Sequence, residues 1–363
     1  MHLVLIETYV WTLIQLNTQQ IKAPCMASKP PPLSLLFIAL SMLSSTTTTS
    51  SSGPGIAIYW GQNGKEGTLQ QACATNNYKI VILAFLTVFG SGRTPKWNFA
   101  GHCGDWSPCT KLAPQIHYCQ SQNIKVFLSL GGGIGHYSLS SPQDAREVAL
   151  YLFESFLSGQ HGPLGTVALD GIDFDIEEGS NLFYDDLVKA INAFSTKEKR
   201  IYLSAAPQCP YPDHYLDKAI KTGLFDYIWV QFYNNPPCQY SNGNPKKLFE
   251  YWDTWTSSVL PNNTVLLGLP AAPRAAGSGF VAAEVVADEI LPYIRQGSNY
   301  GGVMLWSRYY DVQTNFSEKI KGSLMMRSAL KLVKAIGGAI YEGLFSILNR
   351  PYVPKSASLR ADV

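Results

Sequence analysis

The feature that most constrains the fold of this chain is an alternation of eight short apolar runs with longer amphipathic stretches, starting at Gly55. Several runs are almost continuously apolar, which is typical of parallel strands covered on both faces. The stretches between them, such as 141–157, 182–194 and 281–294, have apolar residues at helical spacing. Eight such repeats over about 260 residues predict an α/β protein with a single (β/α)8 TIM barrel. The eight runs are residues 56–60, 79–85, 125–130, 171–176, 201–205, 227–232, 265–269 and 302–306.

A doubly wound open sheet is the rival fold, but it would require a glycine-rich turn after the first strand for a dinucleotide. Residues 60–64, Trp-Gly-Gln-Asn-Gly, have the wrong spacing for that turn.

Of the net charge of +2, residues 1–54 carry +1 and residues 319–363 carry +6, which leaves −5 on residues 55–318. A mildly acidic body argues against nucleic acid as a partner.

The N-terminal region has the pattern of a secretory signal peptide beginning at Met26. Lys29 precedes an apolar run over 33–43, and small residues follow it. That run is too short to span a bilayer as a helix. We therefore expect residues 26–54 to be a signal peptide with a Ser/Thr-rich lead-in. Residues 1–25 are expected to be an upstream extension of the predicted gene, with a genuine N-terminal segment as the alternative.

The C-terminal region, residues 319–363, is expected to lie outside the barrel. Apolar residues at helical spacing alternate with basic residues there, and Gly337-Gly338 interrupt the pattern. Processing or a gene-prediction artefact, a vacuolar sorting extension and a membrane-surface helix all remain open for this segment.

The cysteines support secretion. Of the seven, Cys25 lies in the discounted segment, and six remain, an even number suited to disulfides in an oxidising compartment. Zinc is the competing use, but no pair has CxxC spacing. The sequence alone leaves the pairing of the six cysteines open.

The stretch 169–177 places three carboxylates on one face of a predicted strand. Side chains alternate along a strand, so Asp173, Asp175 and Glu177 point into the barrel and the intervening apolar residues point outward. Buried like charges repel, so we expect a shared proton and at least one raised pKa, as a general acid needs. An exposed edge strand and a divalent metal site are the alternatives.

Residues 170–177, DGIDFDIE, resemble the signature of glycoside hydrolase family 18, and residues 129–133, SLGGG, resemble its second signature. Further motifs at 59–63, 205–209, 230–238 and 301–306 are similar to those of plant class III chitinases of the hevamine type. The resemblance covers residues 55–318, which it marks as a catalytic barrel. It implies an endochitinase that cuts β-1,4 bonds between N-acetylglucosamine units with retention of configuration.

The resemblance also implies roles for individual residues. Glu177 would be the acid, and Asp175 would orient the substrate acetamido group that acts as nucleophile. Asp173 would share a proton with Asp175. The hydroxyl of Tyr233 would donate a hydrogen bond to the acetamido oxygen. Substrate contacts are implied for Trp306, Gln231, Tyr59, Gln62, Asn98 and Asn234, with packing or loop capping as the alternative for the last four. Disulfides are implied between Cys73 and Cys119, Cys103 and Cys109, and Cys209 and Cys238.

The predicted protein is thus a secreted chitinase of plant defence against fungi, with lysozyme side activity left open. It would bind chitin and N-acetylglucosamine oligosaccharides, act as a monomer and need no cofactor or metal. It would not bind nucleic acid or insert stably into a membrane. It would be extracellular, or vacuolar if the C-terminal extension is a sorting peptide. A chitin-binding lectin, a glycosidase inhibitor or a calcium-storage protein on the same barrel are the alternatives. Sequons occur at Asn262 and Asn315.

Overall fold

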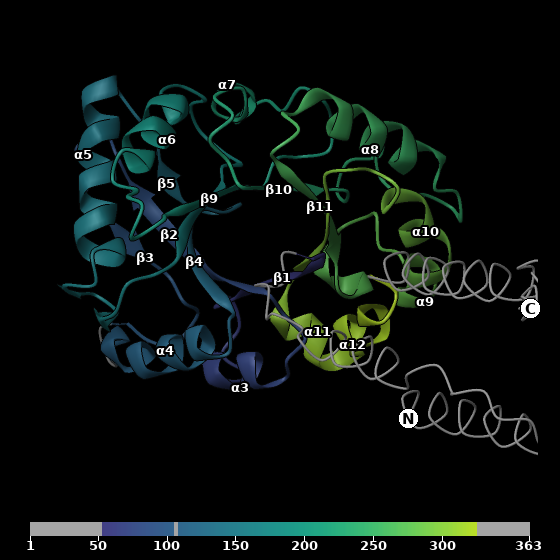
Figure 1. The fold of residues 1–363 in the computed structure, drawn as a ribbon, viewed down its shortest axis with the longest axis horizontal. Helices are drawn as coiled ribbons and strands as arrows, with labels where there is room; N and C mark the ends of the chain where they lie inside the picture. Colours follow the sequence, from purple (N-terminus) through teal and green to yellow (C-terminus); the bar gives the residue numbers. More distant parts are fainter. Residues whose placement is uncertain (1–52, 105–107, 325–363) are drawn as a thin grey trace, which may run out of the picture. The chain divides into compact units, whose positions relative to one another are not determined.

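The computed structural model describes residues 53–104 and 108–324, which form a closed barrel of eight parallel strands with helices between them (Figure 1). This confirms the predicted (β/α)8 barrel, and each of the eight apolar runs contains a barrel strand. The expectations for residues 1–25, for the signal peptide and for the tail beyond 324 concern segments outside the described residues. The barrel strands are β1 Gly55–Trp60, β2 Ile80–Phe89, β4 Lys125–Gly131, β8 Gly171–Asp175, β9 Tyr202–Ala205, β10 Tyr227–Gln231, β11 Thr264–Pro270 and β12 Tyr300–Trp306.

The barrel closes because β1 pairs in parallel with both β12 and β2. The carboxylate strand β8 lies between β4 and β9, and its register decides what surrounds the first carboxylate. Asp173 is level with Ser129 on one side and Ser204 on the other. The parallel register therefore places two hydroxyls beside this acid.

Two of the described helices, α3 Leu69–Ala74 and α5 Pro142–Leu152, begin at a side-chain cap. Thr68 forms a capping box with Gln71 at α3, and Ser141 accepts a hydrogen bond from the backbone N–H of Asp144 at α5. Two of the predicted helices contain a π-helical turn, η2 Phe153–Leu157 and η4 Val286–Ile290. The α-helices are α3 Leu69–Ala74, α4 Ala113–Ser121, α5 Pro142–Leu152, α6 Tyr184–Asn192, α7 Asp217–Ile220, α8 Lys246–Ser258, α9 Ala283–Val285, α10 Leu291–Ile294, α11 Arg308–Thr314 and α12 Phe316–Lys321.

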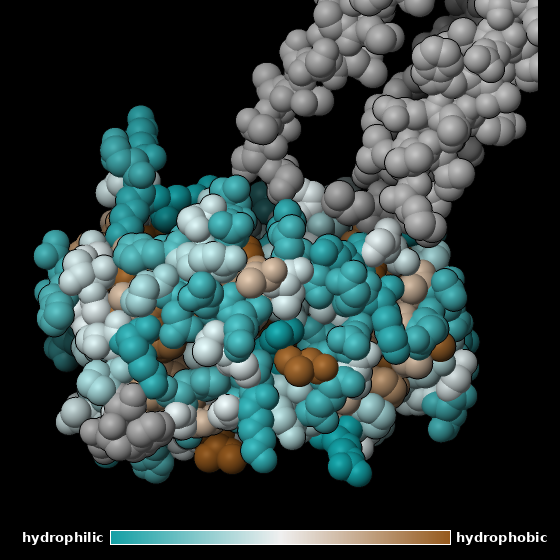
Figure 2. Space-filling model, turned by 90° about the horizontal axis from the view of Figure 1, so that it is seen from below, coloured by the Kyte–Doolittle hydropathy of each residue, from teal (hydrophilic) through white to brown (hydrophobic). Residues whose placement is uncertain are grey.

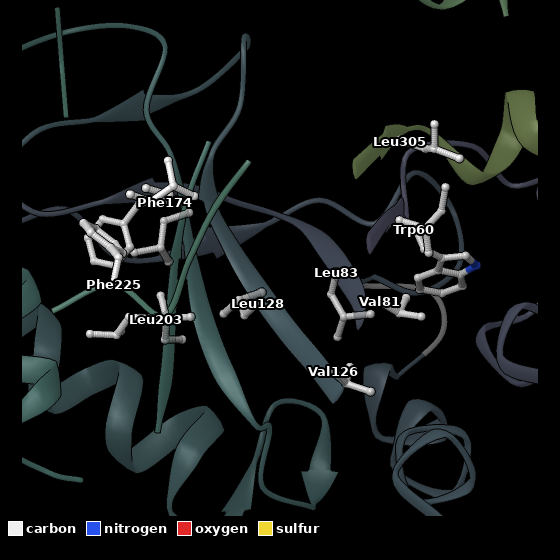
Figure 3. Packing of buried hydrophobic residues seen from close by; sticks show 14 of the residues in the cluster. Trp60, Val81, Leu83, Val126, Leu128, Phe174, Leu203, Phe225 and Leu305 are labelled. Carbon is white, nitrogen blue, oxygen red and sulfur yellow. The ribbon is translucent and has the colours of Figure 1, made fainter. Parts of the chain in front are cut away.

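Strand alternation produces two separate apolar cores. Outward residues such as Leu83, Leu128 and Phe174 pack between the barrel and its helices (Figure 3). Inward residues form a smaller cluster inside the barrel that includes Phe127 and Trp229. The apolar neighbours of Asp173 and Asp175 along β8 belong to the outer core. The two acids therefore point into the barrel, as predicted.

Short elements decorate the loops, and disulfides tie them. They are β3 Lys96–Trp97, β5 His136–Tyr137, the β6–β7 hairpin His161–Gly162 and Gly165–Thr166, and the 3₁₀ turns η1 Cys109–Leu112 and η3 Pro273–Ala275. The three disulfides are those that the family resemblance implies, with Cα–Cα distances of 5.3, 5.0 and 5.9 Å for Cys73–Cys119, Cys103–Cys109 and Cys209–Cys238.

The barrel domain continues past the predicted boundary at residue 318. That position lies inside α12, and Ile320 and Leu324 are buried in the outer core. None of the described helices is long and apolar enough to cross a membrane. One side of the molecule shows mainly hydrophilic residues, with apolar residues scattered among them (Figure 2).

Candidate active site

The first carboxylate of β8, Asp173, is fully buried and surrounded by hydroxyl donors. Its Oδ2 accepts hydrogen bonds from the hydroxyls of Tyr59 at 2.7 Å and Ser129 at 2.6 Å, and its Oδ1 accepts one from Ser204 at 2.8 Å. Burial raises the pKa of Asp173 to about 6, although these hydrogen bonds lower it. A proton on this carboxyl is therefore available near neutral pH.

The second carboxylate, Asp175, lies closer to the mouth of the barrel and is also buried. Its Oδ1 accepts a hydrogen bond of 2.9 Å from Nε2 of Gln231, which also donates to the carbonyl of Ala206. Burial and then the negative charges of Glu177 and Asp173 hold the pKa of Asp175 well above its usual range. The pKa values of Asp175 and Glu177 are both raised, chiefly by burial, so the folded barrel favours protons on these carboxyls.

The third carboxylate, Glu177, follows the end of β8 and is half-buried. Burial is the main cause of its raised pKa, and hydrogen bonds from Asp175 and Gln231 partly offset it. The hydroxyl of Tyr137 accepts hydrogen bonds from the backbone N–H groups of Glu177 and Glu178, each at 3.1 Å. A carboxyl with a raised pKa, on a backbone anchored in this way, suits the role of a general acid.

Glycines let the loop after β4 approach the acids. A Cβ on Gly131, whose φ is +103°, would lie 2.2 Å from the carbonyl oxygen of Asp175. A Cβ on Gly133 would lie 3.3 Å from Oε2 of Glu177. The run of glycines at 131–133 is therefore needed for close backbone approach to the carboxylates.

Tyr233 lies just beyond β10, two residues after Gln231, and is buried. Burial, followed by the charges of Asp175 and Glu177, holds its pKa well above the usual range. Its hydroxyl thus stays protonated and able to donate a hydrogen bond beside both acids. The structure brings together the predicted residues Asp173, Asp175, Glu177, Gln231 and Tyr233.

An aromatic cluster lies beside the acids. The ring centroid of Trp306, at the end of β12, is 5.5 Å from that of Tyr59 and 5.9 Å from that of Phe85, and Trp306 is half-buried. Tyr59 itself is 2% exposed and donates to Asp173, while its hydroxyl accepts from Nε1 of Trp229 at 3.1 Å. Tyr59 therefore supports the first acid through a hydrogen bond.

Three predicted substrate-binding amides are hydrogen-bonded to loop backbone. Nε2 of Gln62 donates to the carbonyls of Ala84 at 2.8 Å and Asn98 at 2.9 Å. Oδ1 of Asn98 accepts from the N–H of Ala100, and Oδ1 of Asn234 accepts from the N–H of Gly277 at 2.7 Å. For these side chains the loop-capping alternative describes the contacts present.

Sequence reasoning missed several residues that complete the site. Ser129 and Ser204 occupy inward positions on strands that flank β8, so the two-residue strand period could have identified them. Tyr137 reaches Glu177 from the loop after β4, a contact that no local pattern signals. Within residues 53–104 and 108–324, no group of three His, Cys, Asp or Glu residues is arranged to hold a metal ion.

A barrel in which β8 and the residues after it carry three carboxylates with raised pKa values has an acid–base site of the kind found in glycosidases. Residues 55–279 match the glycosyl hydrolases family 18 model, and the chain belongs to that family. It is 52% identical to an acidic endochitinase of Vitis vinifera over 303 residues, which are 82% of this chain and all of the relative.

Solved structures include neighbours of two kinds. A chitinase from Ipomoea carnea is 50% identical with a TM-score of 0.70, over 74% of this chain and 99% of its own. A xylanase and α-amylase inhibitor protein from Scadoxus multiflorus is 42% identical, also with a TM-score of 0.70, over 75% of this chain and 99% of its own. The fold is therefore shared by enzymes and inhibitors, and the residues of the site must be used to distinguish the two functions.

Proposed function

We propose that this protein is an endochitinase that hydrolyses β-1,4 bonds between N-acetylglucosamine units of chitin. The observation that carries the proposal is the pair Asp173 and Asp175 on the inward face of β8 with Glu177 just after its end, and the Tyr233 hydroxyl held protonated beside them. The similarity to acidic endochitinases over most of the chain supports the same substrate.

In the proposed reaction, the acetamido oxygen of the bound sugar attacks its own anomeric carbon. The glycosidic bond breaks as the carboxyl of Glu177 donates its proton to the leaving oxygen. Water then attacks the anomeric carbon of the cyclic intermediate from the face that the leaving group occupied, and it gives a proton to Glu177. The configuration at the anomeric carbon is therefore retained. The burial of Glu177 supports this role, because it raises the pKa of the carboxyl that must hold a proton before substrate binds.

Asp175 and Tyr233 would act on the nucleophile. Positive charge develops on the acetamido group as its oxygen attacks, and the carboxylate of Asp175 would stabilise that charge once its proton moves toward Asp173 or Glu177. The Tyr233 hydroxyl would hold the acetamido oxygen at the anomeric carbon. Asp173 can take up a proton near neutral pH, since burial raises its pKa to about 6.

An inhibitor or lectin on the same barrel is the second candidate, and the inhibitor protein among the structural neighbours favours considering it. The two functions differ in whether the carboxyl groups of Asp173, Asp175 and Glu177 take part in a reaction. All four proposed catalytic side chains are present in this chain, which favours catalysis. No observation favours a calcium-storage role.

Hydrolysis of a chitin oligosaccharide by the wild type and by Glu177→Gln tests the proposal. Gln cannot donate the proton, so the turnover rate should fall by about 10²–10⁴-fold. Glu178→Gln is the matched control, because Glu178 is the exposed neighbour of the acid and should retain activity. Proton NMR of fresh product should show the β-anomer first. A folded wild type that binds the oligosaccharide without cleaving it would overturn the enzyme and leave a binding protein.

We further propose that the protein enters the secretory pathway and is released outside the cell or delivered to the vacuole. Three disulfides support an oxidising compartment. A role in defence against fungi would follow from chitin hydrolysis there. Expression in plant tissue, followed by N-terminal sequencing of the mature protein, tests the predicted removal of the signal peptide that begins at Met26.

A further inference from the structure

The backbone around Tyr233 is held by loops from three neighbouring strands. Asn234, which follows it, has a left-handed φ of +57°, and its N–H donates to the carbonyl of Ser278 at 3.1 Å. On the other side, Nδ2 of Asn235 donates to the carbonyl of Tyr233 at 3.0 Å and to Oε1 of Gln208 at 2.6 Å. The position of Tyr233 therefore depends on the loops after β9 and β11 as well as on its own.

Gln239 joins two of these loops through a single buried oxygen. Its side chain is 5% exposed, and its Oε1 accepts from the N–H of Asn235 at 2.9 Å and from Oγ of Ser278 at 2.9 Å. The N–H of Gln239 also donates to the carbonyl of Asn235 at 3.1 Å. One amide oxygen thus fixes the loop after β10 to the loop after β11.

Oε1 of Gln239 also lies where the loop after β11 packs against Tyr233. Gly279 has a φ of +85°, and a Cβ there would lie 2.7 Å from Cα of Tyr233 and 2.9 Å from Oε1 of Gln239. The loop backbone, the amide oxygen and the tyrosine backbone are therefore in close packing. A shift of the loop at Gln239 would be transmitted directly to Tyr233.

We propose that Gln239 is a positioning residue for the Tyr233 hydroxyl, acting through the junction of these two loops. The inference rests on the proposed function, in which that hydroxyl holds the acetamido oxygen. Gln239 has no reacting role of its own. Loss of its oxygen leaves the N–H of Asn235 and the hydroxyl of Ser278, both in partly buried residues, without this acceptor, and we expect the loops to shift. A displacement of about 1 Å at a group that orients the nucleophile can lower the rate up to about 10²-fold.

A double-mutant cycle on hydrolysis of a defined N-acetylglucosamine oligosaccharide tests the inference. Gln239→Met keeps the shape of the side chain and removes the acceptor, and it should lower kcat about tenfold while KM changes less than about twofold. In the Tyr233→Phe background, which has no hydroxyl to position, the same substitution should change kcat less than about twofold. Ser278→Ala removes one of the two donors and should show the same pattern with a smaller loss.

Asn263→Leu is the matched control for stability. Asn263 is 1% exposed and its side chain also caps loop backbone, accepting from Leu260 and donating to Phe225, but in the turn that precedes β11. It should lower the unfolding midpoint with no loss of kcat. Losses from Gln239→Met that are equal in both backgrounds, or an unchanged kcat, would overturn the positioning role. If Gln239→Met does not fold, the cycle with Ser278→Ala decides by the same criterion. An inactive wild type would overturn the proposed function and this inference together.

Discussion

Asp173 is held by three hydroxyls, yet these do not restore the hydration that the carboxylate loses inside the barrel. The hydroxyls of Tyr59, Ser129 and Ser204 all donate to it, and burial still raises its pKa to about 6. A pKa above the unfolded value of 3.8 means that the folded state binds the proton more tightly. This proton stabilises the folded state by about 3 kcal/mol in total. The stabilisation is complete below about pH 3.8 and is lost as the pH rises through about 6.

Asp173→Asn should therefore remove part of the pH dependence of stability. Between pH 4 and pH 7.5 the fall in the free energy of unfolding should be about 2 kcal/mol smaller in the variant than in the wild type, because Asn does not titrate. Urea unfolding at the two pH values measures this difference. Asp288→Asn, at an exposed position, should follow the wild type. An equal fall in Asp173→Asn and the wild type would contradict the assignment of this cost to Asp173.

Much of the carboxylate column could be predicted from the sequence, because strand alternation is a local property. Asp173 and Asp175 both point inward for that reason. The contacts of the amides of Gln62 and Asn234 could not be predicted, because their partners lie 22 and 43 residues away and depend on how the loops meet. A resemblance of motifs identifies the residues and leaves their hydrogen bonds undetermined.

At the scale of elements, the loop after β1 is organised around the buried carboxylate of Glu66. Its Oε1 accepts from the N–H groups of Gly61 and Asn63, each at 2.9 Å, and lies 3.0 Å from Nε2 of His102. Among the residues that the structure describes, its Oε2 has no hydrogen-bond partner. The loop therefore needs one acceptor oxygen at this place, and the second oxygen is buried without a partner.

Glu66→Gln and Glu66→Leu separate the acceptor from the charge. Gln keeps the oxygen that receives all three contacts, so it should change the free energy of unfolding by less than about 1 kcal/mol. Leu leaves the two backbone N–H groups without this acceptor, while His102 keeps only its contact with the carbonyl of Asn63, so Leu should destabilise the protein by about 3 kcal/mol or more. Urea denaturation at pH 7 measures both. Equal destabilisation by Gln and Leu would mean that the negative charge, and not the acceptor, holds the loop.

The helices illustrate a different limit of prediction. Apolar periodicity indicated the long segments 141–157 and 281–294, and α5 and α9–α10 lie within them. Both segments contain a π-helical turn, η2 or η4, which a period of 3.6 residues does not reveal. The existence of each helix follows from its apolar face, whereas its internal irregularity follows from packing on the barrel.

At the scale of the whole molecule, the last helices seal the barrel where its first and last strands meet. The buried carboxylate of Asp311 accepts from the N–H of Ser317 at 2.7 Å, from its hydroxyl at 2.6 Å and from the hydroxyl of Tyr78. Arg308 donates to the same tyrosine at 2.8 Å. This network joins α11 and α12 to the segment before β2, so the C-terminal helices and the start of the barrel support each other.

The burial of Ile320 shows why the catalytic domain does not end at residue 318. Its side chain is fully buried in the outer core, while the neighbouring Lys319 is about half exposed and pairs with Glu284 on the surface. Ile320→Ala in the full chain should lower the free energy of unfolding by about 2–5 kcal/mol, from lost burial and the cavity left behind. Lys319→Ala should leave unfolding unchanged within error, since exposed ion pairs contribute little. Urea unfolding of the two variants side by side tests this, and equal behaviour would mean that α12 contributes nothing to the stability of the barrel.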